Sequence, residues 1–308
     1  MHNFLGAIEA GGTKFVCAVG TDGGEILQRI RIKTSTPEET MPEVIGFFRE
    51  HMKKYPLKAI GCGSFGPIDP DINSKTYGHI THTPKLPWRD YNIVKTLEDA
   101  LQIPVVFDTD VNAAALGEHR WGAGKGISDL IYLTVGTGVG GGAIVNNQLV
   151  HGSAHPEMGH IYIPVDLTQD DFKGICPYHE RCLEGLASGP ALKTRWQVDS
   201  ALDLADDHIA WELEAEYLSY ALVNYMMCFV PKRIILGGGV MKQTHLFEKI
   251  HTKVKAKING YLNQDYCDSI PSIIVPPALA DNAGIMGALA LASTAIGVTR
   301  AEKPLEVE

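Results

Sequence analysis

Residues 4–20 have the sequence FLGAIEAGGTKFVCAVG (Phe4–Gly20), in which two short apolar runs flank a glycine-rich turn, Ala10-Gly-Gly-Thr-Lys14. Apolar runs of this length on either side of a tight turn predict two neighbouring strands. The same layout recurs at residues 130–145, LIYLTVGTGVGGGAIV, where an apolar run ends in Gly136-Thr-Gly-Val-Gly-Gly-Gly142. We interpret the recurrence as an internal structural repeat: two related lobes, each presenting a glycine turn to a shared cleft.

The segments after the first copy predict the rest of the first lobe. We expect a third strand near 24–33, a helix over 37–54, buried strands at 58–64 and 104–107, and a second helix near 92–100 between these two strands. Strands that come first and then alternate with helices are typical of an α/β lobe, here of the βββαβαβ kind.

Helices and strands of the second lobe are predicted in the same way. A helix begins directly after Asp110, and a long helix over 209–229 ends before Pro231, because the residue before a proline resists the α conformation. A strand at 233–236 and a final helix at 284–295 follow. We therefore place a small lobe at residues 1–112, completed by the C-terminal helix at 284–296, and a larger lobe at 113–283.

Composition limits the classes of function. A chain of 308 residues that is 45% hydrophobic can bury one large core or two lobes. The balance of 27 basic against 36 acidic residues gives a net charge of −9, which argues against non-specific binding to nucleic acid or to acidic membranes. We find no signal peptide and no apolar stretch of membrane-spanning length, and we expect a cytoplasmic protein. Cysteines 17, 62, 228 and 267 stand in apolar surroundings and are expected to be reduced core residues.

Three glycine clusters follow predicted strands. Glycine lets the backbone approach an oxyanion closely and lets successive N–H groups point the same way, so such turns bind anions. One cluster alone is more often a plain hairpin turn, but three of them at strand ends favour phosphate binding. Neither a Walker A pattern nor a dinucleotide-binding G-x-G-x-x-G is present. The predicted nucleotide-binding residues are Gly11, Gly12, Thr13, Lys14, Thr137, Gly138, Gly189, Gly237, Gly238 and Gly239.

Acidic residues stand where a buried strand meets a helix, in Phe107-Asp-Thr-Asp-Val-Asn112. Ligands bind at this carboxyl end of strands in open α/β sheets. Either Asp108 or Asp110 could instead cap the helix, which aspartate does well. Because two aspartates leave one for each role, we assign Asp110 as a general base and Asn112 as the group that orients a substrate hydroxyl. Phosphoryl transfer requires such a base, together with donors and Mg²⁺ around the phosphates.

A loop rich in cysteine and histidine predicts a structural zinc site. Cys176-Pro-Tyr-His-Glu-Arg-Cys182 carries two thiols and the His179 imidazole. A further histidine completes a tetrahedral set, and spacing alone leaves His151, His155 and His160 open for this position. Glu157 and Glu184 flank the ligands, so the metal is expected to shape a polar binding surface within residues 157–184 and not to act as a reaction centre. His79 and His82 lack cysteine partners and are expected to lie in a surface loop.

Taken together, the motifs resemble those of ROK-family sugar kinases, and specifically the bacterial zinc-containing fructokinases. The resemblance covers nearly the whole chain. Its most specific parts are Glu157-Met-Gly-His160, the Cys176–Glu184 segment and Asp281-Asn-Ala-Gly284, beside the glycine turns and Asp110-Val-Asn112.

The resemblance implies a two-lobed actin-like ATPase (ribonuclease H-like) fold with ATP between the lobes. It makes Asp110 the base and gives Asn112, Glu157, His160 and Glu184 to the hydroxyls of the sugar. It also makes the zinc ligands His160, Cys176, His179 and Cys182, and it implies a homodimer. The expected reaction is ATP-dependent phosphorylation of fructose at its 6-hydroxyl.

Two positions depart from the family pattern. Where most members carry an aspartate that helps to hold Mg²⁺, this chain has the longer Glu9. Where the related glucokinases have asparagine in a T-P-N-L-x-W segment that touches the sugar, this chain has Lys85. Lys85 and the C-x-x-H-x-x-C order favour fructose over glucose, while mannose, glucose or an N-acylated hexosamine stays an alternative substrate. A repressor of the same family would need a DNA-binding domain before the first strand, and a sugar sensor without activity would not need Asp110.

Overall fold

The computed structural model of this chain describes residues 2–165 and 170–297, and it divides into two compact units. The first unit comprises Met1–Gly117, Ser153–His155 and Asp281–Glu308, and the second comprises Glu118–Gly152 and Pro156–Ala280. Helix α3 (Asp110–Trp121) crosses the division between them. Among the described residues, no helix combines the length and the apolar character that crossing a membrane requires.

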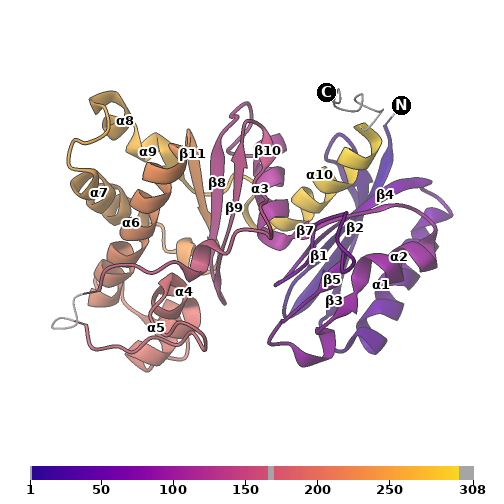
Figure 1. The fold of residues 1–308 in the computed structure, drawn as a ribbon, viewed down its shortest axis with the longest axis horizontal. Helices are drawn as coiled ribbons and strands as arrows, with labels where there is room; N and C mark the ends of the chain where they lie inside the picture. The colour runs from indigo at the N-terminus through magenta and orange to yellow at the C-terminus, as the bar shows by residue number, and fades with distance from the viewer. Residues whose placement is uncertain (1, 166–169, 298–308) are drawn as a thin grey trace, which may run out of the picture. The chain divides into compact units, whose positions relative to one another are not determined.

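The first unit is built on a five-stranded sheet in the order β3-β2-β1-β4-β7 (Figure 1). The central strand β1 pairs antiparallel with β2 and parallel with β4, and β4 in turn pairs parallel with β7. The glycine turn joins β1 to β2, as the alternation of apolar runs predicts. The strands are β1 (Phe4–Ala10), β2 (Lys14–Thr21), β3 (Ile26–Lys33), β4 (Leu57–Ser64) and β7 (Val105–Thr109).

Helices cover both faces of this sheet. On one face, α1 (Pro37–Met52) and α2 (Ile93–Leu101) enclose a core to which Ile60 and Cys62 of β4 contribute. Gly61 points to the other face, where α10 (Ala283–Gly297) packs so closely that a Cβ atom on Gly61 would lie 1.9 Å from the Ala288 carbonyl oxygen. The loop between β4 and α2 adds the short pair β5 (His79–Ile80) and β6 (Tyr91–Asn92) and the 3-10 turn η1 (Leu86–Trp88).

The second unit repeats the topology of the first. Its sheet has the order β10-β9-β8-β11-β12, with β8 antiparallel to β9 and parallel to β11. In both units, the central strand and the two strands on one side of it are joined by antiparallel pairings, and the two strands on the other side are joined by parallel pairings. The predicted internal repeat is therefore confirmed. The strands are β8 (Leu130–Val135), β9 (Val139–Val145), β10 (Gln148–Leu149), β11 (Arg233–Gly237) and β12 (Ile274–Val275).

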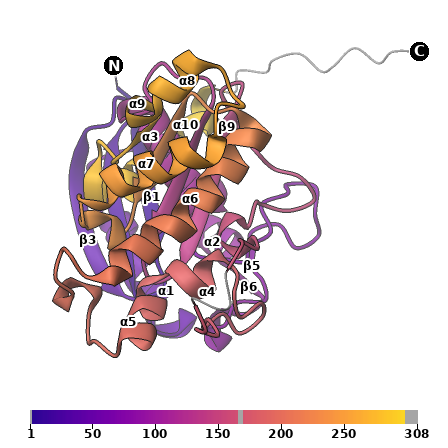
Figure 2. The ribbon, with the colours of Figure 1, turned by 90° about the vertical axis from the view of Figure 1, so that its left-hand side faces the viewer.

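The second core forms between this sheet and the long helix α6 (Ile209–Phe229), with α7 (Leu246–Ile258) packed against α6 (Figure 2). The bounds of α6 agree with the prediction because Pro231 stops the helix. The helices α4 (Leu183–Ala187), α5 (Gly189–Trp196), α8 (Gln264–Asp268) and α9 (Ile270–Ile273) complete the unit, with the 3-10 turns η2 (Met158–His160), η3 (Ala201–Asp203), η4 (Val240–Lys242) and η5 (Ala280–Asn282) in the chain around them.

One expectation about the cysteines is wrong. Cys17, Cys62 and Cys267 are buried free thiols, but Cys228 is exposed. Cys228 lies in the last turn of α6, where Met227 and Phe229 are also partly exposed, so its apolar neighbours in sequence do not indicate burial. These side chains are exposed because the helix extends past the core before it ends.

Candidate active site and metal centre

One edge of the first sheet carries both the glycine turn and the predicted base. Strands β1, β4 and β7 run parallel, and their last residues stand in register, Ala10 beside Ser64 and Ser64 beside Thr109. The turn that follows β1 and the residue that follows β7, Asp110, therefore leave the same edge of the sheet. With about 4.8 Å between neighbouring strands, the two backbones leave it about 10 Å apart.

The first glycine turn has the form of an anion receptor. Gly11 donates its N–H to the Lys14 carbonyl at 3.0 Å, and the Thr34 hydroxyl donates to the Gly11 carbonyl at 2.7 Å. These bonds fix the turn, whereas the N–H groups of Gly12 and Thr13 have no hydrogen-bond partner among the described residues. Two adjacent unbonded N–H groups at a strand end, beside the cation of Lys14, match the chemistry of a phosphate.

The start of α3 holds Asp110 and Asn112 in fixed positions. The Thr109 hydroxyl accepts the Asn112 N–H at 3.0 Å, so Thr109 caps the helix. The sequence alone had indicated Asp108 or Asp110 for this position. The buried carboxylate of Asp108 accepts the Asn112 side-chain N–H at 2.8 Å and thereby orients this amide. Asp110 is half-buried, and its Oδ1 accepts the N–H of Val111 at 2.9 Å.

Glu9 is accommodated by a glycine on α10. A Cβ atom on Gly284 would lie 2.6 Å from Cδ of Glu9, so the Glu9 side chain occupies the space that a side chain at position 284 would need. Burial raises the pKa of Glu9 above its ordinary value, and the nearby cations of Lys14, Arg29 and Arg31 oppose this rise. The pairing of Glu9 with Gly284 connects two motifs that lie far apart in the sequence.

In the second unit, three glycine segments meet at one point. The Gly136 N–H donates to the Gly138 carbonyl at 2.8 Å, and the Gly136 carbonyl accepts the N–H of Gly189 at 2.8 Å. Gly189 begins α5, which Ser188 caps, so the positive end of a helix dipole faces this turn. A Cβ atom on Gly136 would lie 3.7 Å from the Gly239 nitrogen, which brings the cluster after β11 to the same place.

Glu184 joins the glycine turn to the cysteine loop. Its Oε2 accepts the N–H of Val139 at 3.0 Å, and a Cβ atom on Gly138 would lie 2.6 Å from the same oxygen. A side chain on Gly138 would therefore displace the Glu184 carboxylate, which occupies the space beside it. Two residues with separate predicted roles, one for nucleotide and one for sugar, are neighbours.

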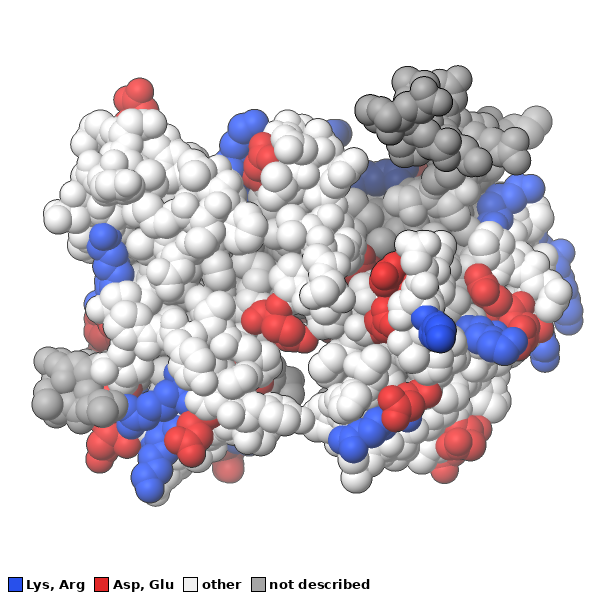
Figure 3. Space-filling view, viewed as in Figure 1, with Lys and Arg blue, Asp and Glu red and all other residues white. Residues whose placement is uncertain are grey.

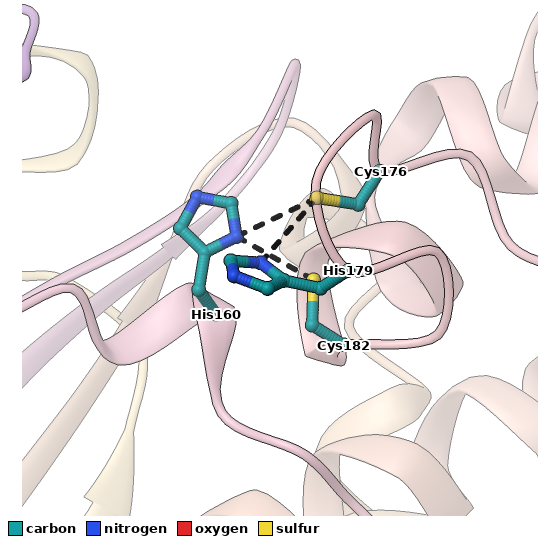
Figure 4. Close-up of side chains that lie close together, drawn as sticks. All are labelled: His160, Cys176, His179 and Cys182. Atoms are coloured by element: carbon teal, nitrogen blue, oxygen red, sulfur yellow. Dashed lines mark hydrogen bonds between the residues drawn. The ribbon is translucent and has the colours of Figure 1, made fainter.

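Four side chains converge on a point that fits a tetrahedral metal ion (Figure 4). Nδ1 of His160 lies 3.4 Å from Sγ of Cys182 and 3.8 Å from Sγ of Cys176, and Nδ1 of His179 lies 3.7 Å from Sγ of Cys176. Zn–S and Zn–N bonds of about 2.3 and 2.0 Å would place neighbouring tetrahedral ligands about 3.3 to 3.8 Å apart. Donor types and spacing both fit Zn²⁺. His160 is thus the histidine that the structure places with the thiols, while His155 accepts the Ile68 N–H in the first unit.

The backbone holds this metal loop in place. Cys176 and Glu180 exchange two hydrogen bonds across a tight turn, and the Leu183 N–H donates to the Ile161 carbonyl at 2.9 Å. A Cβ atom on Gly174, which has a φ of +76°, would lie 2.1 Å from the Glu180 carbonyl oxygen, and one on Gly185 would lie 1.9 Å from it. Burial raises the pKa of the Cys182 thiol to about 11, and a metal ion bound there would favour its thiolate form.

His160 presents its second nitrogen to Glu184. With Nδ1 directed to the thiols, Nε2 lies 3.9 Å from Oε1 of Glu184. Metal-bound histidines usually direct their other nitrogen to a carboxylate, which fixes the ring. Glu157 is exposed at the start of η2, and its carbonyl accepts the N–H of His160 at 3.0 Å. The close packing of η2 on β9 requires Gly159, whose Cβ atom would lie 1.7 Å from the Val139 carbonyl oxygen.

Charged side chains of both signs are mixed on the molecular face that Figure 3 shows, with no continuous basic surface.

Two contacts of the site residues were not predicted from the sequence. Asp108 and Asn112 are four residues apart, which is a spacing that brings side chains together at the start of a helix and could have revealed the pair. The bond between Glu184 and Val139 joins positions 45 residues apart and has no local signal.

Residues 5–295 of the chain match the ROK family. The chain is similar to the fructokinase of Pediococcus pentosaceus, with 45% identity over 95% of this chain and 98% of that protein. It is also similar to the fructokinase of Lactococcus lactis subsp. cremoris, with 42% identity over 92% of this chain and 94% of the relative. Among solved structures, a ROK family glucokinase from Streptomyces griseus in complex with glucose and AMPPNP has a TM-score of 0.74 and 26% identity, and the match covers 96% of this chain and 100% of that one.

Proposed function

This chain belongs to the ROK family, and from that premise we propose that it is an ATP-dependent fructokinase. It transfers the γ-phosphoryl group of ATP to the 6-hydroxyl of fructose and releases fructose 6-phosphate and ADP. The observation that carries the proposal is the likeness to fructokinases along nearly the full length of both chains. The placement of a carboxylate, Asp110, at the same sheet edge as an anion-binding turn supports it.

The residues assigned in the two units have separate roles in this reaction. Asp110 accepts the proton of the attacking hydroxyl, and Asn112 orients that hydroxyl while Asp108 holds its amide. Glu157, His160 and Glu184 hold the other hydroxyls of the sugar. The nucleotide is held by the turn at Gly11–Lys14 and by the second unit's cluster of Thr137, Gly138, Gly189 and Gly237–Gly239.

Two metal ions belong to the proposal. Zn²⁺ would be held by His160, Cys176, His179 and Cys182, where it fixes the loop that carries the sugar ligands, away from the phosphates. Glu9 is the carboxylate we assign to Mg²⁺, which would be bound together with ATP and would screen the charge of the phosphates. A bound cation would favour the charged form of Glu9, against the effect of its burial.

The wider setting follows from the same family membership. We propose lobes at residues 1–112 with 284–296 and at 113–283, a homodimer, and a cytoplasmic enzyme whose partners are hexose and ATP. Neither nucleic acid nor membrane has a role. The mixed charge that Figure 3 shows and the net charge of −9 both support this last point.

A coupled assay of ADP release across four sugars tests the proposed activity. With fructose, mannose, glucose and N-acetylglucosamine at equal concentration, we expect fructose to give the largest kcat/KM. Phosphorylation at the 6-hydroxyl is checked by nuclear magnetic resonance of the product. If another sugar gave a larger kcat/KM, that sugar would replace fructose as the assigned substrate. If no sugar stimulated ADP release, the proposed kinase activity would be refuted.

Two glycine variants should separate the nucleotide from the sugar. Gly239 has ordinary helical dihedral angles, and a Cβ atom there meets nothing within 4 Å, so Gly239→Val should fold normally. Because its side chain would enter the space proposed for ATP, we expect a loss of nucleotide affinity of at least about tenfold, with fructose affinity kept. Gly138→Val instead displaces the Glu184 carboxylate and should weaken both ligands.

Titration calorimetry with each ligand measures both effects. Gly238 is unsuitable for this test, because its φ of +93° and a Cβ position 2.3 Å from the Val135 carbonyl oxygen would cause misfolding. If Gly239→Val left nucleotide affinity intact, or reduced fructose affinity to the same extent, the cluster after β11 would not be part of the nucleotide site.

A further inference from the structure

Lys85 lies across the first glycine turn. A Cβ atom on Gly12 would be 2.8 Å from Cε of Lys85 and 3.7 Å from its Nζ. The side chain therefore occupies the space that the absence of a side chain at Gly12 leaves open. The Lys85 ammonium therefore lies beside Gly12, the first of two adjacent residues, Gly12 and Thr13, whose backbone N–H groups have no hydrogen-bond partner in the described part of the chain.

The backbone of Lys85 is anchored by the residue three positions later. The Trp88 N–H donates to the Lys85 carbonyl at 2.9 Å, and the buried Trp88 ring packs on Phe15 of β2, with 5.1 Å between ring centroids. The indole N–H of Trp88 also donates to the Ser35 carbonyl at 2.6 Å. Lys85 is thus held by the strand that leaves the turn, and its position beside Gly12 is set by the core.

The charge of Lys85 has no acidic partner. Within 4.0 Å of its Nζ there is no carboxylate oxygen among the described residues, although Lys85 is half-buried. A half-buried cation without a counter-ion, next to unbonded N–H groups in a glycine turn, forms a receptor for a group with several negative oxygens. A neutral sugar hydroxyl would leave this charge uncompensated.

We propose that Lys85 is a catalytic residue whose ammonium binds the phosphoryl group while it passes from ATP to the sugar. This inference rests on the proposed kinase function. The bond from the sugar oxygen to Pγ forms, the bond from Pγ to the β–γ bridging oxygen breaks, the hydroxyl proton goes to Asp110, and ADP leaves. Lys85 exchanges no proton: it compensates the charge on the phosphoryl oxygens throughout the transfer.

Two substitutions of Lys85, with a control at another lysine, test the role. Lys85→Met keeps the length of the side chain without its charge, and we expect kcat to fall about 10²-fold while the Kd of fructose changes little. ATP should bind more weakly to Lys85→Met than to the wild type, whereas ADP, which lacks the γ-phosphoryl group, should bind equally well. Lys85→Arg keeps the charge and should restore part of kcat. Lys75→Met, which removes an exposed lysine from the same loop, is the matched control and should keep wild-type kinetics.

Two results would overturn the proposal. One is a kcat for Lys85→Met within threefold of the wild type. The other is a pair of effects on the sugar alone: Lys85→Met loses only fructose affinity, and Lys85→Asn shifts the preference from fructose to glucose at unchanged kcat. Lys85 would then be a residue that contacts the sugar. If the wild-type protein phosphorylates a different hexose, the fructose assignment fails. The kinetics of the Lys85 variants and the wild type are then compared with that hexose, and the result decides the catalytic role of Lys85 by the same criteria.

Discussion

Asp110→Asn is expected to lower kcat by about 10²- to 10⁴-fold, because the variant removes the group that accepts the proton of the attacking hydroxyl. The amide keeps an Oδ1 that can still accept the Val111 N–H, the bond that holds the Asp110 side chain at the start of α3. The helix cap comes from Thr109 and is not altered. The fold and ATP binding should therefore survive while the chemical step fails.

The measurement combines steady-state kinetics with calorimetric Kd values for ATP and fructose. Asp99→Asn is the matched control, because Asp99 is an exposed aspartate of the same unit whose carboxylate pairs with Lys95, and its loss should leave kcat unchanged. A kcat for Asp110→Asn above about a third of the wild-type value would remove Asp110 from the role of base, and the neighbouring Asp108 would become the next carboxylate to test.

Loss of the metal is expected to raise the KM of fructose and to lower thermal stability before it affects ATP. Cys182→Ser replaces one of four converging ligand atoms, so Zn²⁺ should be lost. The backbone bonds of the loop between Cys176 and Leu183 remain, and they limit the damage to the ligand side chains. Without its metal the His160 ring can turn, and its Nε2 then no longer faces Glu184. We expect about a tenfold higher fructose KM, comparable to the loss of an outer-shell partner of a metal site.

Elemental analysis, fructose KM and the melting temperature are measured for Cys182→Ser, for wild-type protein after prolonged chelation, and for Cys228→Ser. Cys228 is an exposed free thiol away from the cluster, so its variant shows what loss of a cysteine alone does. The wild type should contain about one zinc per chain, as one tetrahedral four-ligand site requires. Full activity in a zinc-free preparation, or an unchanged fructose KM after chelation, would show that the cluster has no part in sugar binding.

The secondary structure was accessible from sequence because its signals are local. Apolar runs broken by glycine predicted β1 and β2, and Pro231 set the end of α6. The repeat of strand, turn and strand at 130–145 predicted a second sheet with the topology of the first. Cys228 shows the limit of such signals, because local hydrophobicity does not reveal where a helix leaves the core. The short helix α7, whose packing on α6 covers the second core, was also not predicted.

For the site, the sequence by itself determined the chemical inventory: the glycine turns, Asp110, and the thiols and imidazoles of the metal loop. Only the tertiary structure decided which of these groups meet. Lys85 reaches Gly12 from 73 positions away, Glu184 binds Val139, and Glu9 fills the space beside Gly284. The physical reason is that each contact joins residues from separate strands, loops or helices. Their distances depend on the register of the sheets and on the packing of the cores, which local sequence patterns do not specify.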